Sequence, residues 1–432
     1  MATNKPLTLR RNFSWTFVGN IIYAACQWGI VVVLAKLGKP EMVGQFTLGL
    51  AVTAPVIMFT NLQLRAIQAT DAKQQYAFED YLGLRLITTG LALAIIIGIV
   101  FLVGYRWEIS IVIFIIALAK SFEAISDVFY GLVQQHERMD RIAISMMIKG
   151  PLSLVVLGCG IYLTGNIVWG VIGLAVAWAI VLLSFDIHSG ILMVQTTSNS
   201  SPRDKVIGNS VREVRLKPRW NWVKQKKLIL LSLPLGFVMM LISLNINIPR
   251  YFIERYLGER ELGFFAAIGY FMLAGTMVVN ALGESANPRL AKYYATGDSL
   301  AFRTLLLKLV GIGISIGGIG VLVSVVAGRQ ILTLVYRPEY GEYTGILILL
   351  MLATAVNYVA SLLGYGMTAA RYFRIQIPLF ALVTAISAVV CFLLIPHNGL
   401  QGAAIALLIA AVVQVILSLA VNLLAISKLA RN

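Results

Sequence analysis

The sequence predicts an all-α polytopic membrane protein with twelve transmembrane helices in two six-helix lobes. The 432 residues are 59% hydrophobic and only 12% charged, whereas a soluble domain carries about 25% charged residues. Twelve apolar runs reach the roughly 20 residues that a helix needs to cross a bilayer. A charged hairpin motif also occurs once in each half of the chain, which indicates a pseudo-repeat.

The twelve runs fall into two groups of six, separated by a polar and basic stretch. We therefore expect an N-terminal lobe at 1–194, a basic cytoplasmic linker at 195–227 and a C-terminal lobe at 228–432. The predicted spans are 13–35, 43–66, 82–104, 109–133, 142–163 and 167–193, followed by 228–252, 262–286, 303–327, 345–368, 374–395 and 400–426.

The hairpin motif supports two related halves. It lies in residues 244–267, LNINIPRYFIERYLGERELGFFAA, and in a weaker form in residues 33–50, VLAKLGKPEMVGQFTLGL. Each copy joins an apolar helix to Leu-Gly, a charged pair or trio that ends in Glu, then Gly and an aromatic residue. Equivalent hairpins in equivalent places are typical of transporters with internal repeats.

The distribution of Lys and Arg predicts that both termini are cytoplasmic. With the N-terminus inside, 26 basic residues, Lys149 among them, lie on the cytoplasmic side and 8 lie outside. This asymmetry obeys the positive-inside rule. Basic loops beside anionic lipids also explain the net charge of +16, so we expect no nucleic-acid partner. The first apolar run is too long for the h-region of a signal peptide, and we expect no cleaved signal.

Polar residues follow one face of the 109–133 span. Lys120, Glu123, Asp127, Tyr130 and Gln134 recur at steps of three and four, which places them on one helical face. Three charges at the centre of a span cost on the order of 8–10 kcal/mol, more than the apolar residues of the span return. We expect Lys120 to pair with Glu123, and Asp127 to meet a cation from elsewhere. A substrate pathway is one interpretation of these charges, and a structural ion network is the alternative.

Other spans carry milder polar stripes, drawn from both halves. Such stripes favour a polar cavity between the halves, although each one is equally typical of interhelical hydrogen bonding. Arg65, Arg85 and Arg250 are candidate cations for the pathway, and Arg65 and Arg85 are equally well explained as positive-inside residues at helix ends. The further candidate pathway residues are Asn20, Gln27, Asn245, Asn247, Asn280 and Glu284, and Asn357 extends the pattern to 345–368.

Several absences exclude other functions. Cys26, Cys159 and Cys391 each lie in an apolar run without metal-ligand spacing, so we expect no disulfide, metal or cofactor. The sequence contains neither a Walker A loop nor an HExxH motif. The loops are too short for a soluble catalytic domain. These observations favour a transporter over an enzyme.

Residues 12–71 and 231–267 resemble the starts of the two halves of Wzx-type oligosaccharide flippases, which handle O-antigen and exopolysaccharide repeat units. That family belongs to the superfamily of the MATE drug exporters and the lipid II flippase MurJ. The resemblance implies two MATE-like lobes around a central cavity and alternating access. It also implies transport of undecaprenyl-diphosphate-linked oligosaccharides across the bacterial cytoplasmic (inner) membrane for surface polysaccharide biosynthesis. Its implied partners are the lipid-linked substrate, membrane lipids and, as a further candidate, polysaccharide polymerase machinery.

Two alternatives to the flippase function stay open. One is a MATE-type cation-coupled exporter of small molecules, although the 13–35 span lacks the Asp or Glu that many MATE exporters carry there. The other is a membrane partner of a polysaccharide assembly complex without transport of its own. Twelve spans also differ from the fourteen typical of MurJ. Coupling to protons, to sodium ions or to no ion is compatible with these residues.

Overall fold

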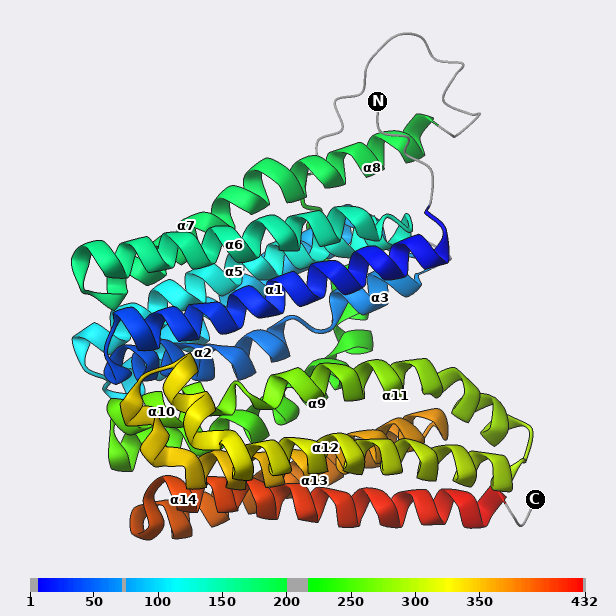
Figure 1. Cartoon of the computed structure of the whole chain (residues 1–432). Helices are drawn as coiled ribbons and strands as arrows, with labels where there is room; N and C mark the ends of the chain where they lie inside the picture. The colour runs from blue at the N-terminus through cyan, green and yellow to red at the C-terminus, as the bar shows by residue number, and fades with distance from the viewer. Residues whose placement is uncertain (1–6, 72–74, 200–216, 430–432) are drawn as a thin grey trace. The chain divides into compact units, whose positions relative to one another are not determined.

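The computed structural model describes residues 7–71, 75–199 and 217–429, which form helices and no strand (Figure 1). The first half contains α1 (Leu9–Leu37), α2 (Pro40–Thr60), α3 (Leu64–Thr70), α4 (Phe78–Val103), α5 (Trp107–Gln135), α6 (Met139–Thr164), α7 (Ile167–Val181), the π-helix η1 (Leu182–Asp186) and α8 (Ile187–Asn199). The second half contains α9 (Trp222–Leu257), α10 (Glu259–Gly269), α11 (Met272–Ala295), α12 (Ser299–Val335), the 3-10 helix η3 (Pro338–Tyr343), α13 (Thr344–Ala369) and α14 (Phe373–Leu429).

The helices account for all twelve predicted spans. Among the described residues, ten helical segments are long and apolar enough to cross a membrane, and the α10–α11 pair, bent by 43°, is an eleventh. The long α14 holds two helices that meet at Gly399, where φ is 55° and ψ is −137°. Glycine adopts a positive φ at little steric cost, so the chain turns there and continues as a further span. The predicted all-α polytopic fold class is confirmed.

The chain divides into two compact units. The first unit consists of Met1–Gly38 and Val52–Met240, and the second of Lys39–Ala51 and Leu241–Asn432. Two helices contribute to both units, because α2 begins in the second unit and α9 begins in the first. The lobe boundaries at 194 and 228 therefore remain a prediction.

In the first unit, α5 is the central helix. It packs against α3, α4, α7 and α8, and Val112, Ile116 and Val128 on it are buried. Figure 1 shows α6 beside α1 and α7, and both neighbours contact it extensively. Because helices surround α5 on several sides, its polar face meets other protein side chains.

In the second unit, α13 has the corresponding position. It packs against α10, α11, α12 and α14. The buried residues Tyr358 and Leu362 of α13 lie in one cluster with Leu290 and Phe302. Since α5 is the fourth span of the first half and α13 the fourth span of the second, the packing of each unit agrees with the predicted pseudo-repeat.

The two copies of the hairpin motif meet inside the second unit. A Cβ atom at Gly44 of α2 would lie 1.9 Å from the Glu259 carbonyl oxygen, and one at Gly263 of α10 would lie 1.9 Å from the Pro40 carbonyl oxygen. Gln45 Nε2 also donates a hydrogen bond to Glu259 Oε2 over 2.6 Å. Gly44 and Gly263 occupy equivalent places in the motif. Because neither has a side chain, the backbone at the start of each helix can pack closely against the glycine of the other.

Candidate functional site

The polar face of α5 carries an internal ion pair. Lys120 Nζ lies 2.7 Å from Glu123 Oε2, and the two side chains are 27% and 31% exposed. Tyr23 of α1 donates its hydroxyl to the other Glu123 carboxylate oxygen over 2.9 Å. The predicted pairing of Lys120 with Glu123 is confirmed, and α1 supplies a partner that sequence reasoning did not assign.

Asp127, one turn further along α5, lies between two arginines. Arg65 Nη1 is 3.4 Å from Asp127 Oδ1, and Arg85 Nη2 is 3.5 Å from Asp127 Oδ2. Arg65 Nε also donates to Gln134 Oε1 over 3.0 Å, while the fully buried Arg85 donates to the Asn61 side chain. The prediction that Asp127 meets a cation from elsewhere is confirmed, and both candidate arginines belong to its ion network.

A third polar chain connects α6 to η1. Lys149 Nζ donates to the Tyr130 hydroxyl over 3.1 Å, and the Tyr130 and Ser145 hydroxyl oxygens are 2.8 Å apart. Ser145 then donates to Asp186 Oδ1 over 2.6 Å. All four side chains are buried. Asp186 ends the π-helix η1, a rare helix form that is frequent at functional sites.

The structure adds to the sequence-based description of Lys149, which was counted among the basic residues of the cytoplasmic side. The residue is only 2% exposed and lies well inside α6, and the side of the membrane on which it lies stays a prediction. It is buried because Tyr130 and Trp178 cover its ammonium group. The signal was present in the sequence, since Lys149 falls within the predicted 142–163 span.

Two aromatic rings connect these charges. Lys120 Nζ lies 4.9 Å from the centre of the Trp178 ring, and Lys149 Nζ lies 5.8 Å from it. The Tyr130 ring is 5.5 Å from the Arg65 guanidinium carbon. Such cation–π contacts are attractive, because a cation meets the negative face of the ring. We call the whole group the charge cluster, and it has one more cation than carboxylate: Arg65, Arg85, Lys120 and Lys149 with Glu123, Asp127 and Asp186.

The two candidate residues of α1, Asn20 and Gln27, are not the residues through which α1 contacts the charge cluster. Asn20 is exposed and Gln27 is half-buried. Within the described ranges, the Gln27 Nε2 atom is buried without a hydrogen-bond partner. Tyr23, which lies between them in sequence, is the α1 residue that contacts Glu123.

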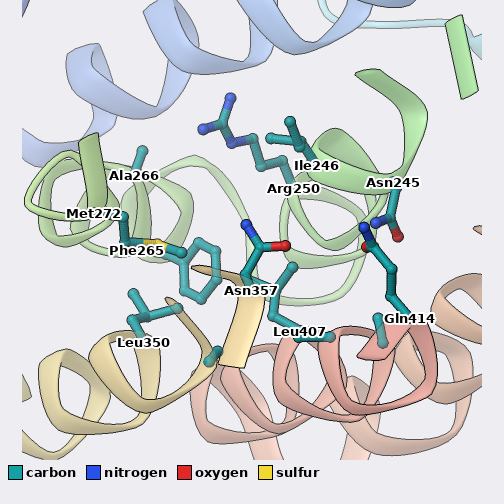
Figure 2. A pocket seen from close by; sticks show the side chains of 14 residues that line it. Asn245, Ile246, Arg250, Phe265, Ala266, Met272, Leu350, Asn357, Leu407 and Gln414 are labelled. Carbon is teal, nitrogen blue, oxygen red and sulfur yellow. The ribbon is translucent and has the colours of Figure 1, made fainter. Parts of the chain in front are cut away.

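The second unit contains an open pocket with a cavity volume of about 120 Å³. Helices α9, α13 and α14 supply its polar side chains, Asn245, Arg250, Asn357 and Gln414, and α10 supplies Phe265. Figure 2 shows the Asn245 and Gln414 amides close together on one side and Asn357 in the middle of the view. In the same view the Arg250 guanidinium extends away from these three amide groups. We call this the amide pocket.

The Arg250 guanidinium is hydrogen-bonded to a side-chain amide. Its Nη1 atom donates to Asn247 Oδ1 over 2.9 Å, and Asn247 donates in turn to the Ser243 carbonyl over 2.8 Å. Among the described residues, no carboxylate forms an ion pair with Arg250. Asn247 therefore positions the guanidinium, while Asn245 and Arg250 line the pocket as two of the predicted pathway residues.

The remaining candidates, Asn280 and Glu284, lie elsewhere. Both are exposed on α11, and neither lines the amide pocket. Their part in a pathway stays a prediction. Gln414 was not singled out from the sequence, and the available signal was an amide near the middle of the mostly apolar 400–426 span.

No metal centre is evident in the part of the chain that the structure describes. It contains no group of three or more His, Cys, Asp or Glu residues able to hold a metal ion. The thiols of Cys26, Cys159 and Cys391 are free. That the protein works without metal or cofactor remains an expectation.

The helices and the charged groups inside them define a multi-pass membrane protein built from two compact helical units. Residues 9–294, more than half of the chain, match the family of polysaccharide biosynthesis proteins. The chain belongs to this family.

Individual relatives agree with this assignment. A capsular polysaccharide biosynthesis protein of Staphylococcus aureus, CapF, is 30% identical over 406 residues, which cover 94% of this chain and 97% of CapF. Among solved structures, the lipid II flippase MurJ in an inward closed conformation matches with a TM-score of 0.70 at 13% identity, over 96% of this chain and 90% of MurJ. An inward-facing multidrug resistance MATE family transporter matches with a TM-score of 0.66 at 16% identity, over 96% of this chain and 99% of that one. These matches confirm the MATE-like fold and the family resemblance.

Proposed function

We propose that this protein is a flippase that moves undecaprenyl-diphosphate-linked oligosaccharide repeat units across the cytoplasmic membrane for surface polysaccharide biosynthesis. Membership of the polysaccharide biosynthesis family and the fold shared with a lipid II flippase support this function. The lipid tail of such a substrate stays in the hydrocarbon region. Its glycan and diphosphate need a polar route, because unpaired polar groups are costly in an apolar medium.

The charge cluster of the first unit is the observation that carries the proposal. Ionisable groups inside membrane spans are costly and mark substrate or ion pathways. Lys120 and Arg65 are 27% and 33% exposed, so an anion is able to approach them. Behind them, Arg85, Lys149 and Asp186 are buried and hold the network in place.

The ion pairs suggest how the cluster handles a diphosphate. Each accessible cation now has a carboxylate partner, Glu123 for Lys120 and Asp127 for Arg65. Phosphate oxygens form charge-assisted hydrogen bonds of the same kind with lysine and arginine. An arriving diphosphate therefore competes with the carboxylates for these cations. This exchange of partners changes the relative free energies of the conformations of the helices that carry them, as alternating access requires.

A deletion strain tests the proposal directly. Deleting the gene in a host without a paralogue is expected to abolish surface polysaccharide and to leave the lipid-linked repeat unit on the cytoplasmic face. The purified protein in proteoliposomes is expected to make a fluorescent lipid-linked oligosaccharide accessible from the opposite leaflet. Normal polysaccharide in the deletion strain would contradict the proposal.

A MATE-type exporter of small molecules is the second candidate, and the shared fold with a multidrug transporter favours it. The sequence of α1 argues against an exporter, because it contains no Asp or Glu where many MATE exporters have one. Drug sensitivity with intact polysaccharide in the deletion strain would support the exporter. Loss of polysaccharide without flipping by the purified protein would support a non-transporting partner of polymerase machinery.

The proposed flippase lies in the bacterial inner membrane with both termini in the cytoplasm and has no enzymatic activity. Basic residues support this orientation, including the exposed Lys226 and Lys227 and the half-buried Lys224 just before the apolar part of α9. In that orientation the basic linker at 195–227 faces anionic lipid headgroups. Its central residues, 200–216, lie outside the described ranges.

A further inference from the structure

Arg250 differs from the cations of the charge cluster in its surroundings. Arg65, Arg85 and Lys120 each lie within 3.5 Å of a carboxylate oxygen, and Lys149 is linked to Asp186 through two hydroxyls. Arg250 donates to the Asn247 amide, and its side chain is only partly exposed. A partly desolvated cation without a counter-charge favours an anion beside it.

The rest of the amide pocket has unused hydrogen-bonding capacity. Within the described part of the chain, the Asn357 and Gln414 side chains form no hydrogen bond, and the buried Asn245 Oδ1 atom has no partner. Each primary amide offers two donors and an acceptor, a combination that pairs with neighbouring sugar hydroxyls. Phe265 lines the same cavity and adds apolar surface, which suits the C–H groups of a sugar.

The number of cations in the pocket indicates which class of anionic ligand it binds. Among the described residues, Arg250 is the single cation that lines the amide pocket. A diphosphate carries more than one negative charge and is matched better by several cations. A carboxylate carries one charge and accepts two parallel hydrogen bonds from a guanidinium. We propose that the amide pocket of the second unit binds an acidic sugar of the transported glycan, with Arg250 on the sugar carboxylate and Asn245, Asn357 and Gln414 on its hydroxyls. This inference rests on the proposed flippase function and adds the class of sugar.

Binding to the purified full-length protein in detergent provides the test. Saturation-transfer NMR measures the binding of glucuronate and of glucose through their ring protons, and inorganic diphosphate serves as the unlabelled competitor of glucuronate. We expect glucuronate to bind, glucose to bind about tenfold more weakly or not at all, and inorganic diphosphate to displace glucuronate poorly. The expected ratio corresponds to the loss of one charge-assisted hydrogen-bonded contact.

Four variants connect binding to the pocket. Arg250→Gln is expected to reduce glucuronate affinity by about tenfold or more. The matched control is Arg255→Gln, which removes the same charge from an exposed position on the same helix, outside the pocket, and should leave binding unchanged. Asn357→Ala and Gln414→Ala remove pocket-lining amides that make no hydrogen bond among the described residues, so these variants should fold normally and also weaken binding. If Arg250→Gln does not fold, the Asn357→Ala and Gln414→Ala variants test the proposal in its place.

Two outcomes would overturn the proposal. The first is equal binding of glucose and glucuronate that Arg250→Gln leaves unchanged. The second is displacement of glucuronate by inorganic diphosphate at lower concentration, because the pocket would then be a diphosphate site. Failure of the flippase function gives a different result, in which the wild-type protein moves no lipid-linked oligosaccharide in proteoliposomes, whatever it binds.

Discussion

Lys149 Nζ donates a hydrogen bond to the Tyr130 hydroxyl over 3.1 Å, and both side chains are buried in the first unit. Tyr130 continues this contact through Ser145 to Asp186. The chain thus begins at a buried cation and ends at a buried carboxylate. Each end provides the counter-charge that makes burial of the other tolerable, and this mutual dependence can be measured.

Removing either end of this chain is expected to destabilise the protein. Lys149→Met or Asp186→Asn leaves the opposite charge buried without its counterpart, which costs about 3–5 kcal/mol in comparable cases. The double variant should lose less than the sum of the two single losses, because neither charge then remains. Thermal unfolding of the purified protein in detergent, followed by tryptophan fluorescence, measures the effect. Lys226→Met, at an exposed position of α9, is the control, and strictly additive losses would refute the coupling.

The exposed layer of the charge cluster is expected to matter for transport more than for folding. Lys120, Glu123 and Asp127 are each about 30% exposed. When one of them is replaced, its former partner is therefore still accessible to water. We expect Lys120→Ala, and at least one of Glu123→Gln and Asp127→Asn, to abolish flipping at normal protein abundance. Complementation of a deletion strain and quantitative immunoblotting of membranes provide the two readouts.

The control for these variants is Glu108→Gln, which removes a 70% exposed carboxylate at the start of the same helix. It should complement fully. If all three cluster variants also complement, the α5 stripe has only a structural role. If they fail because the protein disappears from the membrane, the alternative of a structural ion network is favoured.

The reciprocal glycine contact predicts a steric requirement in the second unit. Alanine at Gly44 or Gly263 would place a Cβ atom 1.9 Å from a backbone carbonyl oxygen, and backbone on both sides leaves little room for adjustment. We expect each substitution to destabilise the protein by about 3 kcal/mol or more. Gly364→Ala is the control, because a Cβ atom there meets nothing within 4 Å. Melting temperatures of the three variants provide the comparison, and equal values would contradict close packing.

The predicted orientation is testable by cysteine labelling. A cysteine at Ser200, outside the described residues, is expected to be shielded from an impermeant thiol reagent added to intact cells. A cysteine at Arg260, whose side chain is 60% exposed in the predicted outer hairpin, should react. The background requires replacement of the native cysteines, since Cys159 is itself exposed. Labelling at position 200 with protection at position 260 would reverse the topology.

Much of the fold was predictable because a bilayer imposes a simple requirement on sequence. Apolar runs of sufficient length located every span, and the step of three from Lys120 to Glu123 predicted their ion pair. The cost of burying charge likewise predicted that Asp127 needs a cation. These inferences depend on composition and on positions within one helix, which a single sequence contains.

The partners across helices were not predictable in the same way. Nothing local to Asp127 indicates that Arg65 and Arg85 are its cations, because 42 or more residues separate them in sequence. The link from Lys149 to Asp186 depends on how α5, α6 and η1 pack. Asn245, Asn357 and Gln414 share a pocket only because α9, α13 and α14 come together there.

The contact between Gly44 and Gly263 also sets an order of events during synthesis. The segment Lys39–Ala51 belongs to the second unit, yet its packing partner at the start of α10 is translated more than 200 residues later. At about 5–20 residues per second, the early segment waits roughly 10–40 s for that partner. During this interval the nascent first unit emerges with part of α2 unpacked. The second unit therefore completes its packing only after the ribosome has passed the middle of the message.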